Sequence, residues 1–258
     1  MIFLIEIGDY VTRNSYKNDT VFKVINRKND ILYLKGVEYR LYADANVKDC
    51  VLVDKKNVKD TFKPKDNYSK TLRDEYFYLP GKILHLDGDN EYLNRCMDYY
   101  KKNNLFAIGK KIDEETIYSE IKDLLKEIKP DILVITGHDY LKKNTNKKDI
   151  NNYQNSINFV KAVKEARKYE KSHDKLVIIA GACQSDYEDL IKAGANFASS
   201  PKRINIHALD PAIIASTLSL TERNKEIDLI DLLSKTKNGP SGIGGLVCNG
   251  LMYVGYPR

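Results

Sequence analysis

Apolar runs and amphipathic stretches alternate along residues 78–258. The apolar runs predict strands at residues 82–87, 105–109, 131–136, 175–180 and 246–254. The amphipathic stretches predict helices at residues 91–102, 114–128, 155–170, 186–193, 211–220 and 227–234. Two of these runs, at residues 131–136 and 175–180, are almost continuously apolar after their first residue, as expected for parallel strands that are covered on both faces. This alternation predicts an α/β fold with a mainly parallel sheet sandwiched by helices.

The first 55 residues have a different pattern, in which short apolar or aromatic runs are separated by polar turns. These runs predict strands at residues 7–11, 21–25, 31–34, 39–42 and 51–53. Five short strands in such a length favour a small SH3-like β-barrel. Residues 56–77 are charged and have little apolar periodicity, so they predict a linker. The expected organisation is a barrel at residues 1–55, a linker at 56–77 and an α/β domain at 78–258.

Composition narrows the class of protein. The chain has 258 residues, of which 42% are hydrophobic, and a formal net charge of +6. The positive excess is spread along the chain and indicates either a lysine-rich solvated surface or attraction to an anionic partner such as nucleic acid. The opening apolar run meets Glu6 too early for a signal peptide. No apolar run approaches the roughly 20 residues that span a bilayer. These features predict a cytoplasmic protein with no membrane insertion.

Cysteine usage argues against a scaffold of disulfides or metals. The four cysteines are Cys50, Cys96, Cys183 and Cys248, and none belongs to a C-x-x-C pair. Such spacing fits a reducing compartment and gives no structural zinc pattern. The glycine-rich stretch at residues 239–245 lacks the phosphate-binding pattern and is interpreted as a turn before the last strand. We expect neither a metal nor an organic cofactor.

Two predicted strands end in reactive side chains. His138 follows the run at residues 131–136, and Cys183 follows the run at 175–180. One strand–loop–helix unit separates them, so the two strand ends can be neighbours at the edge of the sheet where sites form. A nearby imidazole can take the proton of a thiol and later protonate the leaving amine. Either residue alone is more often structural, but together they predict a cysteine peptidase.

The surroundings of Cys183 suit this chemistry. Cys183 precedes the helix expected at residues 186–193, and the positive end of that helix dipole would favour the thiolate. The backbone N–H of Cys183 and one near Gly137 or Asp139 are candidate oxyanion donors. His207 is a rival base, whereas Cys50, Cys96 and Cys248 are expected to be core or surface thiols. Residues 140–152 follow the base and are expected to form an exposed, mobile, lysine-rich loop that gates the site or is self-cleaved.

An apolar strand that ends near His, followed by one that ends in Ala-Cys, resembles the caspase, legumain and clostripain clan of cysteine peptidases. More closely, the chain resembles the YabG family of sporulation-specific peptidases. The resemblance lies in residues 78–89, 130–139, 180–185 and 193–211, with further similarity at 7–9 and 39–41. It therefore covers nearly the whole chain. The clan usually has Gly directly after the catalytic His, whereas here Gly137 precedes His138 and Asp139 follows it.

The resemblance implies a caspase-like fold and an endopeptidase that trims spore-coat and germination-related proteins after Arg or Lys. It places the base at His138 and the nucleophile at Cys183. It also implies action in the mother cell, with association to the developing spore coat. A pocket for a basic side chain needs a carboxylate. Asp87 is the first candidate because the equivalent position lines the specificity pocket of related peptidases, and Asp89 and Asp210 are alternatives. All three are equally well explained as turn or helix-capping residues.

Two further classes of function remain open from the residues alone. A glutamine-amidotransferase-like hydrolase also places Cys on a strand–helix turn, but its His follows the Cys, so it would depend on His207. A non-enzymatic basic protein would bind RNA or a coat scaffold through the N-terminal domain, and its binding would weaken steeply with salt.

Overall fold

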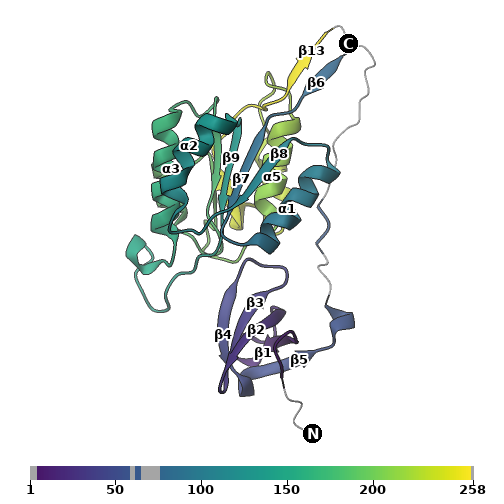
Figure 1. Cartoon of the computed structure of the whole chain (residues 1–258), viewed down its shortest axis with the longest axis vertical. Coiled ribbons are helices and arrows are strands. Elements are labelled where there is room, and N and C mark those ends of the chain that lie inside the picture. Colours follow the sequence, from purple (N-terminus) through teal and green to yellow (C-terminus); the bar gives the residue numbers. More distant parts are fainter. Residues whose placement is uncertain (1–4, 59–61, 65–75, 257–258) are drawn as a thin grey trace. The chain divides into compact units, whose positions relative to one another are not determined.

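The computed structural model of the chain describes residues 5–58, 62–64 and 76–256 (Figure 1). Two compact units divide the chain, at residues 1–63 and 64–258. Most of the expected linker at residues 56–77 lies outside the described residues. Each unit is considered by itself below.

The N-terminal unit is a five-stranded antiparallel sheet with the order β4-β3-β2-β1-β5. Its strands are β1 (Tyr10–Arg13), β2 (Phe22–Lys28), β3 (Ile31–Gly36), β4 (Tyr42–Asn46) and β5 (Cys50–Val53). Short 3₁₀ turns lie at Asn14–Tyr16, Val47–Asp49 and Lys55–Asn57. Alternate residues of the strands point inward, and Val24, Leu32 and Leu34 are buried in one small core.

Two of the expected strands in this unit are displaced along the chain. The first strand begins at Tyr10, three positions after the expected start at Ile7. The strand expected at residues 39–42 begins only at Tyr42, because Leu41 N–H donates to Tyr39 O and closes a turn there. Periodicity locates such short strands poorly when aromatic residues also occupy the turns.

The C-terminal unit contains a six-stranded, mostly parallel sheet with the order β12-β11-β10-β9-β7-β8. Its strands are β7 (Ile83–Asp87), β8 (Ala107–Lys111), β9 (Ile132–Thr136), β10 (Val177–Ala180), β11 (Phe197–Ser199) and β12 (Ile243–Gly245). Only β12 runs antiparallel to its neighbour in this sheet. A separate two-stranded antiparallel sheet pairs β6 (Phe77–Leu79) with β13 (Tyr253–Gly255).

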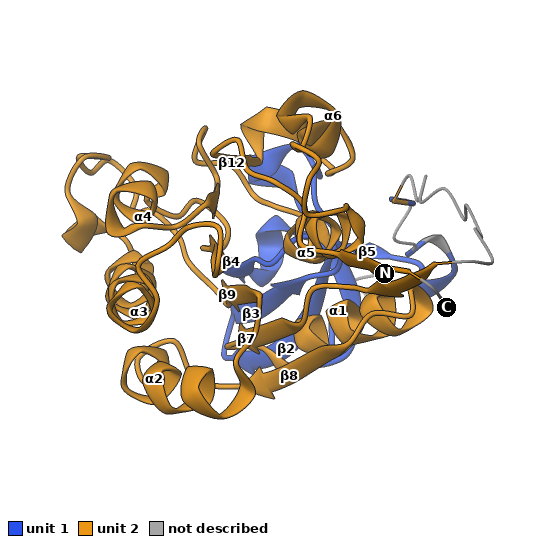
Figure 2. Cartoon of the chain, turned by 90° about the horizontal axis from the view of Figure 1, so that it is seen from above, with its two compact units in different colours: residues 1–63 blue, residues 64–258 orange. Residues whose placement is uncertain are grey.

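Helices cover both faces of the parallel sheet, which confirms the predicted α/β layering. The helices are α1 (Asn90–Lys102), α2 (Ile117–Ile128), α3 (Ser156–Tyr169), α4 (Tyr187–Ala193), α5 (Asp210–Leu220) and α6 (Leu229–Ser234). Figure 2 shows α2, α3 and α4 on one side of the strands, with α1 and α5 on the other. Residues of β7, β9 and β10 are buried on both faces, which explains their continuous apolar runs.

The prediction of a last strand at residues 246–254 was wrong. The edge strand is instead β12, inside the glycine-rich stretch that was interpreted as a turn, and β13 begins only at Tyr253. A Cβ on Gly245 would lie 2.3 Å from the Phe197 ring of β11. The glycine lets the edge strand pack this closely, so its function here is close approach and not a turn.

Across the described part of the chain, the helices are too short or too polar to cross a bilayer.

Candidate active site

The strand ends that carry the candidate catalytic residues lie side by side. β9 and β10 are parallel neighbours, with Ala180 paired to Ile135. His138 lies two residues beyond the end of β9, and Cys183 lies three residues beyond the end of β10. β7 pairs with β9 on the other side, and the chain order reverses between these two strands. This is the switch point at which open α/β sheets bind ligands.

A tight turn after β10 holds Cys183. Gly181 has a φ of 105°, which favours glycine, and a Cβ there would lie 2.9 Å from Leu190 Cδ1. The Cys183 thiol is fully buried and contacts the backbone of Ile206, whose N–H donates to Sγ at 3.4 Å. Gln184 N–H donates to Ile204 O at 3.1 Å. The segment around Ile206 therefore holds the turn, a contact that spacing alone did not predict.

The helix after Cys183 begins within one residue of its expected start at Asp186. α4 starts at Tyr187, and Asp186 caps it by accepting the N–H of Asp189 at 3.3 Å. Arg203 Nη2 lies 3.1 Å from Asp186 Oδ1. The first turn of α4 therefore interacts with Asp186, three residues beyond the thiol.

His138 is held on its side chain and on its backbone. Its Nε2 lies 3.1 Å from Asp89 Oδ2, and its ring packs against the ring of Tyr92 with centroids 5.6 Å apart. The backbone N–H donates to Glu114 Oε1 at 2.7 Å, and the carbonyl accepts from Asn155 Nδ2 at 2.9 Å. The side chain is 15% exposed. The contacts with Asp89 and Tyr92 hold the imidazole in a defined orientation.

Glu114 is a site residue that sequence reasoning missed. Its carboxylate packs directly against the turns at Gly88 and Gly137. A Cβ added to either glycine would come within 2.3 Å of Glu114 Oε1. The same oxygen accepts the His138 N–H. Gly137, expected as an oxyanion residue, therefore makes room for a carboxylate in this structure. The only sequence signal of this packing was the glycine directly after each of the strands β7 and β9.

Asp139 is buried and ties the two strand ends together. Its carboxylate accepts the hydroxyls of Ser156 and Ser185, the latter at 2.8 Å, and the backbone N–H of Asn155 at 2.8 Å. Ser185 Oγ in turn accepts Ala182 N–H at 2.9 Å, next to Cys183. Burial raises the pKa of Asp139 above 3.8, and these hydrogen bonds offset only part of that effect. The sequence suggested Asp139 as a backbone donor to the oxyanion. The structure shows in addition that its side chain holds the two strand ends together.

The three candidate specificity carboxylates lie in different settings. Asp87 ends β7, is fully buried, and accepts from Asp89 N–H at 2.9 Å and from the Thr136 hydroxyl at 2.8 Å. Asp89 caps α1 by accepting the N–H groups of its first turn. Asp210, also fully buried, accepts the backbone N–H groups of His207 and Lys237, both at 2.9 Å. Asp87 and Asp89 therefore lie near His138 at the carboxyl edge of the sheet. Asp210 instead connects the backbone at His207 to the backbone at Lys237.

The other histidines have structural contacts. His207 is fully buried, and its Nδ1 accepts the Leu209 N–H at 3.1 Å. His85 lies inside β7, with its ring nitrogens 3.0 Å from the Tyr100 hydroxyl and 2.8 Å from the Thr136 hydroxyl. His173 lies 3.4 Å from Arg167 in a turn. Of the four histidines, His138 is the one that follows the carboxyl end of a strand in the parallel sheet.

The loop after the base is anchored at its root. Leu141 and Tyr153 form an antiparallel bridge, and the Lys142 N–H donates to Asn152 O at 3.0 Å. A 3₁₀ turn follows at Ile150–Asn152. Its lysines are exposed, as expected.

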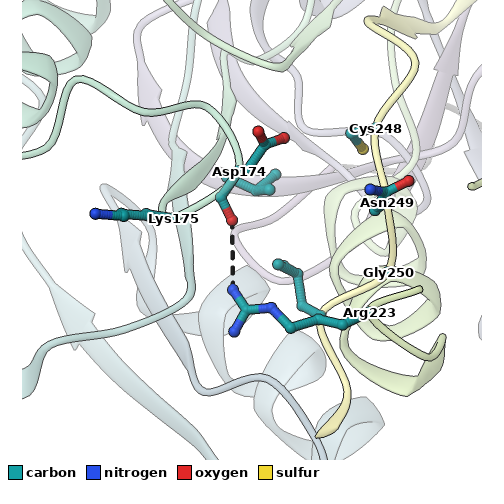
Figure 3. Close-up of a pocket in the computed structure, with 8 residues that line it drawn as sticks. Asp174, Lys175, Arg223, Cys248, Asn249 and Gly250 are labelled. Carbon is teal, nitrogen blue, oxygen red and sulfur yellow. Dashed lines mark hydrogen bonds between the residues drawn. The ribbon is translucent and has the colours of Figure 1, made fainter. Parts of the chain in front are cut away.

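A cavity of about 130 Å³ lies away from these strand ends (Figure 3). It opens beside Val177, the first residue of β10, so it lies at the amino end of that strand. Asp174, Arg223 and Cys248 are among its lining residues, and Arg223 donates to the Asp174 carbonyl. Among the residues that the structure describes, no three His, Cys, Asp or Glu side chains form a metal-binding group.

Comparison with known proteins identifies the family. The family described as YabG peptidase U57 matches residues 6–72 and 59–257. The sporulation-specific protease YabG of Bacillus subtilis (strain 168) is 40% identical over 283 aligned positions, which cover 98% of each chain. Both matches extend over nearly the whole sequence and both name a protease. A peptidase activity also sets aside the amidotransferase and non-enzymatic alternatives as the main function. The chain therefore belongs to the YabG family of sporulation peptidases.

Proposed function

We propose that this peptidase is a cysteine endopeptidase in which His138 and Cys183 form the catalytic dyad. The observation that supports this most strongly is the pairing of β9 with β10, which places both residues at the carboxyl edge of the sheet. Thiol and imidazole are the nucleophile and the base that peptide hydrolysis requires. The resemblance to the caspase, legumain and clostripain clan supports the same pair.

The proposed reaction has two steps. His138 takes the proton from Cys183 Sγ, the thiolate attacks the scissile carbonyl carbon, and the protonated imidazole gives its proton to the leaving amine. Water then attacks the thioester with His138 as the base, which releases the acid and restores the thiol. The N–H of Cys183 and a second donor from Gly137 or Asp139 stabilise the oxyanion. The N–H between those two, on His138, already donates to Glu114.

We propose Asp87 as the carboxylate that gives a preference for Arg or Lys before the cleaved bond. It ends β7 opposite Thr136, one strand from His138, at the switch point of the sheet. Asp89 is a weaker candidate because its carboxylate faces the His138 ring and caps α1. Asp210 is weaker because its carboxylate holds the backbones of His207 and Lys237 together. A buried carboxylate would also partner the desolvated cation of the substrate.

The dyad is tested with fluorogenic peptides that end in Arg, Lys, Asp or Leu. The enzymes are wild type, Cys183→Ala, His138→Ala and His207→Ala. We expect rapid cleavage after Arg and Lys by wild type and His207→Ala, and a loss of at least about a thousandfold in the other two. Activity that persists without Cys183 or His138 would overturn the dyad, and loss in His207→Ala alone would move the base there.

Asp87→Asn tests the specificity proposal in the same assay. The amide keeps the acceptor for Asp89 N–H but lacks the negative charge. We expect kcat/KM for Arg and Lys peptides to fall by about a hundredfold, with Leu peptides changed little. Asp210→Asn is measured beside it, because Asp210 is also a fully buried carboxylate and is an alternative candidate for the same pocket. A loss for Arg and Lys peptides in Asp210→Asn alone would move the specificity to Asp210. An unchanged preference in Asp87→Asn would remove Asp87 from the pocket.

We further propose that the enzyme processes spore-coat and germination-related proteins, acting in the mother cell and at the developing coat. The name of the Bacillus subtilis relative supports a sporulation role. The mostly parallel sheet supports a caspase-like catalytic domain, and the β1 strand between β2 and β5 supports an SH3-like N-terminal domain. Incubating coat extracts with wild type and Cys183→Ala, followed by sequencing of new termini, tests this. Termini that follow no basic residue would contradict it.

A further inference from the structure

Asp89 connects the first turn of α1 to the imidazole of His138. Its Oδ1 accepts the N–H groups of Glu91 and Tyr92, at 2.9 and 3.2 Å. Its other oxygen, Oδ2, lies 3.1 Å from His138 Nε2. The side chain is 6% exposed, so this contact is shielded from water. A single carboxylate thus joins the end of β7, the start of α1 and the ring that follows β9.

This contact selects one form of the neutral imidazole. An ionised carboxylate only accepts hydrogen bonds, so Nε2 carries the hydrogen that it donates to Asp89. Nδ1 then carries the lone pair that can take up a proton. The Tyr92 ring, which comes from the same first turn of α1, packs against the His138 ring at an interplanar angle of 54°. One helix turn therefore supplies both the acceptor and the aromatic contact.

We propose that Asp89 is a positioning residue for His138, and not a residue of the specificity pocket. This proposal rests on the proposed dyad of His138 and Cys183. Asp89 keeps the hydrogen on Nε2, so that Nδ1 accepts the proton of Cys183 Sγ. The resulting imidazolium is then paired with a shielded carboxylate until Nδ1 returns the proton to the leaving amine. Asp89 itself gains and loses no proton.

The geometry separates this role from substrate binding. Oδ1 already serves two backbone N–H groups, and Oδ2 faces the imidazole, so an incoming cation would have to displace one of them. A role as a helix cap alone is the remaining alternative. Asn caps helices about as well as Asp does, which makes Asp89→Asn the variant that separates the cap from the imidazole contact.

Asp89→Asn should reverse the hydrogen bond to the ring. The amide Nδ2 of Asn would donate to Nε2, which forces the hydrogen onto Nδ1 and removes the base. We expect kcat to fall by about 10³- to 10⁴-fold, the scale of a wrong histidine tautomer, with KM and the basic preference unchanged. Asp228→Asn is the matched control, because Asp228 is the exposed cap of α6 and accepts the N–H of Asp231 at 3.0 Å. Its activity should equal that of wild type.

A spectroscopic readout tests the same contact without any catalysis. The full chain with Cys183→Ala is labelled with ¹⁵N in its histidine rings and studied by NMR. The ring signals of His138 are assigned as those that disappear in Cys183→Ala/His138→Ala. We expect the Nε2–H form in Cys183→Ala and the Nδ1–H form in Cys183→Ala/Asp89→Asn. Asp228→Asn in that background should keep the Nε2–H form.

The outcomes separate the two levels of the proposal. If Cys183→Ala or His138→Ala cleaves peptides as wild type does, the proposed dyad fails, and the tautomer still reports whether Asp89 orients the ring. If Asp89→Asn keeps wild-type kcat, or leaves the tautomer unchanged, the positioning role is overturned. If Asp89→Asn loses only the Arg and Lys peptides, Asp89 belongs to the specificity pocket and the proposal is also overturned.

Discussion

Asp139 shows how one buried carboxylate can organise two strand ends. It accepts hydroxyls from α3 and from the turn after β10, as well as the Asn155 and Tyr140 N–H groups. These bonds make burial of the charged form tolerable, but desolvation still raises the pKa of Asp139 above 3.8. The folded state therefore holds this proton more tightly than the unfolded state. The contribution of Asp139 to stability is fully present below the unfolded-state pKa and is lost as the pH rises through the folded-state pKa.

Replacing Asp139 with Asn should remove this dependence on pH. The difference in free energy of unfolding, wild type minus Asp139→Asn, should fall as the pH rises from about 4 to about 7. Urea unfolding at several pH values measures it, with Cys183→Ala in both proteins to prevent self-cleavage. Asp149→Asn is the control, because Asp149 caps an exposed 3₁₀ turn. A difference that stays flat or rises with pH would contradict the assignment.

Cys248 should resist alkylation in the folded protein. It is 9% exposed, and burial with the nearby charge of Asp174 raises the pKa of its thiol to about 11. At pH 8 only about a thousandth of it is thiolate, the form that reacts. Iodoacetamide treatment and peptide mapping should find Cys248 unmodified in buffer and modified in urea. Equal modification under both conditions would show that the thiol is accessible in the folded state.

At the scale of elements, the turns after β7 and β9 and the residues before α2 form one packed unit. Glu114 precedes α2 and lies over Gly88 and Gly137, with the His138 N–H as donor to its carboxylate. Two glycines are needed because a Cβ at either position would overlap that carboxylate. The backbone of the base therefore depends on a residue that belongs to neither strand.

A double-mutant cycle should detect this coupling. Gly137→Ala pushes Glu114 away from His138 N–H, and Glu114→Ala removes the same acceptor, so each variant should lose about 1–2 kcal/mol of stability. The double variant should lose little more than either single one, which gives a coupling energy of about 1 kcal/mol by urea unfolding. Glu115→Ala, at an exposed neighbouring position, should show additive effects with Gly137→Ala. If the stability losses of Gly137→Ala and Glu114→Ala were also additive, the proposed coupling between Gly137 and the Glu114 carboxylate would be contradicted.

At the scale of the whole molecule, the described residues of each unit contain a hydrophobic core that belongs to that unit alone. Leu32 and Leu34 belong to the core of the N-terminal unit, and Ile178 and Leu133 belong to a core between the parallel sheet and its helices. All four side chains are fully buried. Each unit therefore has its own source of stability.

Leu34→Ala should destabilise one unit selectively. The lost contacts and the cavity should cost about 2–5 kcal/mol in the N-terminal unit. Hydrogen exchange by mass spectrometry should show lost protection in β2 and β3, with β9 and β10 unchanged. Ile178→Ala should give the reverse pattern. Equal loss in both units from Leu34→Ala would mean that they unfold as one.

The sequence by itself determined the layered α/β domain, the antiparallel N-terminal sheet and the family. Parallel strands that are buried on both faces leave nearly continuous apolar runs, and amphipathic helices leave a period of 3.6. The strands β7, β9 and β10 and the six helices could therefore be located from the apolar pattern. One crossover between β9 and β10 was enough to expect His138 and Cys183 at adjacent strand ends. Motifs of up to nineteen residues carried the family resemblance.

Only the tertiary structure decided which polar groups meet at that edge. The contacts of His138 with Glu114 and Asp89 span 24 and 49 positions of the chain, and no local period encodes such pairs. The strand β12 was missed because its glycines are selected by the close Phe197 ring, and not by strand propensity. Asp139 acts through its side chain because folding buries it beside hydroxyls from two other segments. Hydrogen bonds over long sequence separations depend on the packed fold, and for that reason the detailed site could not be derived from the chain alone.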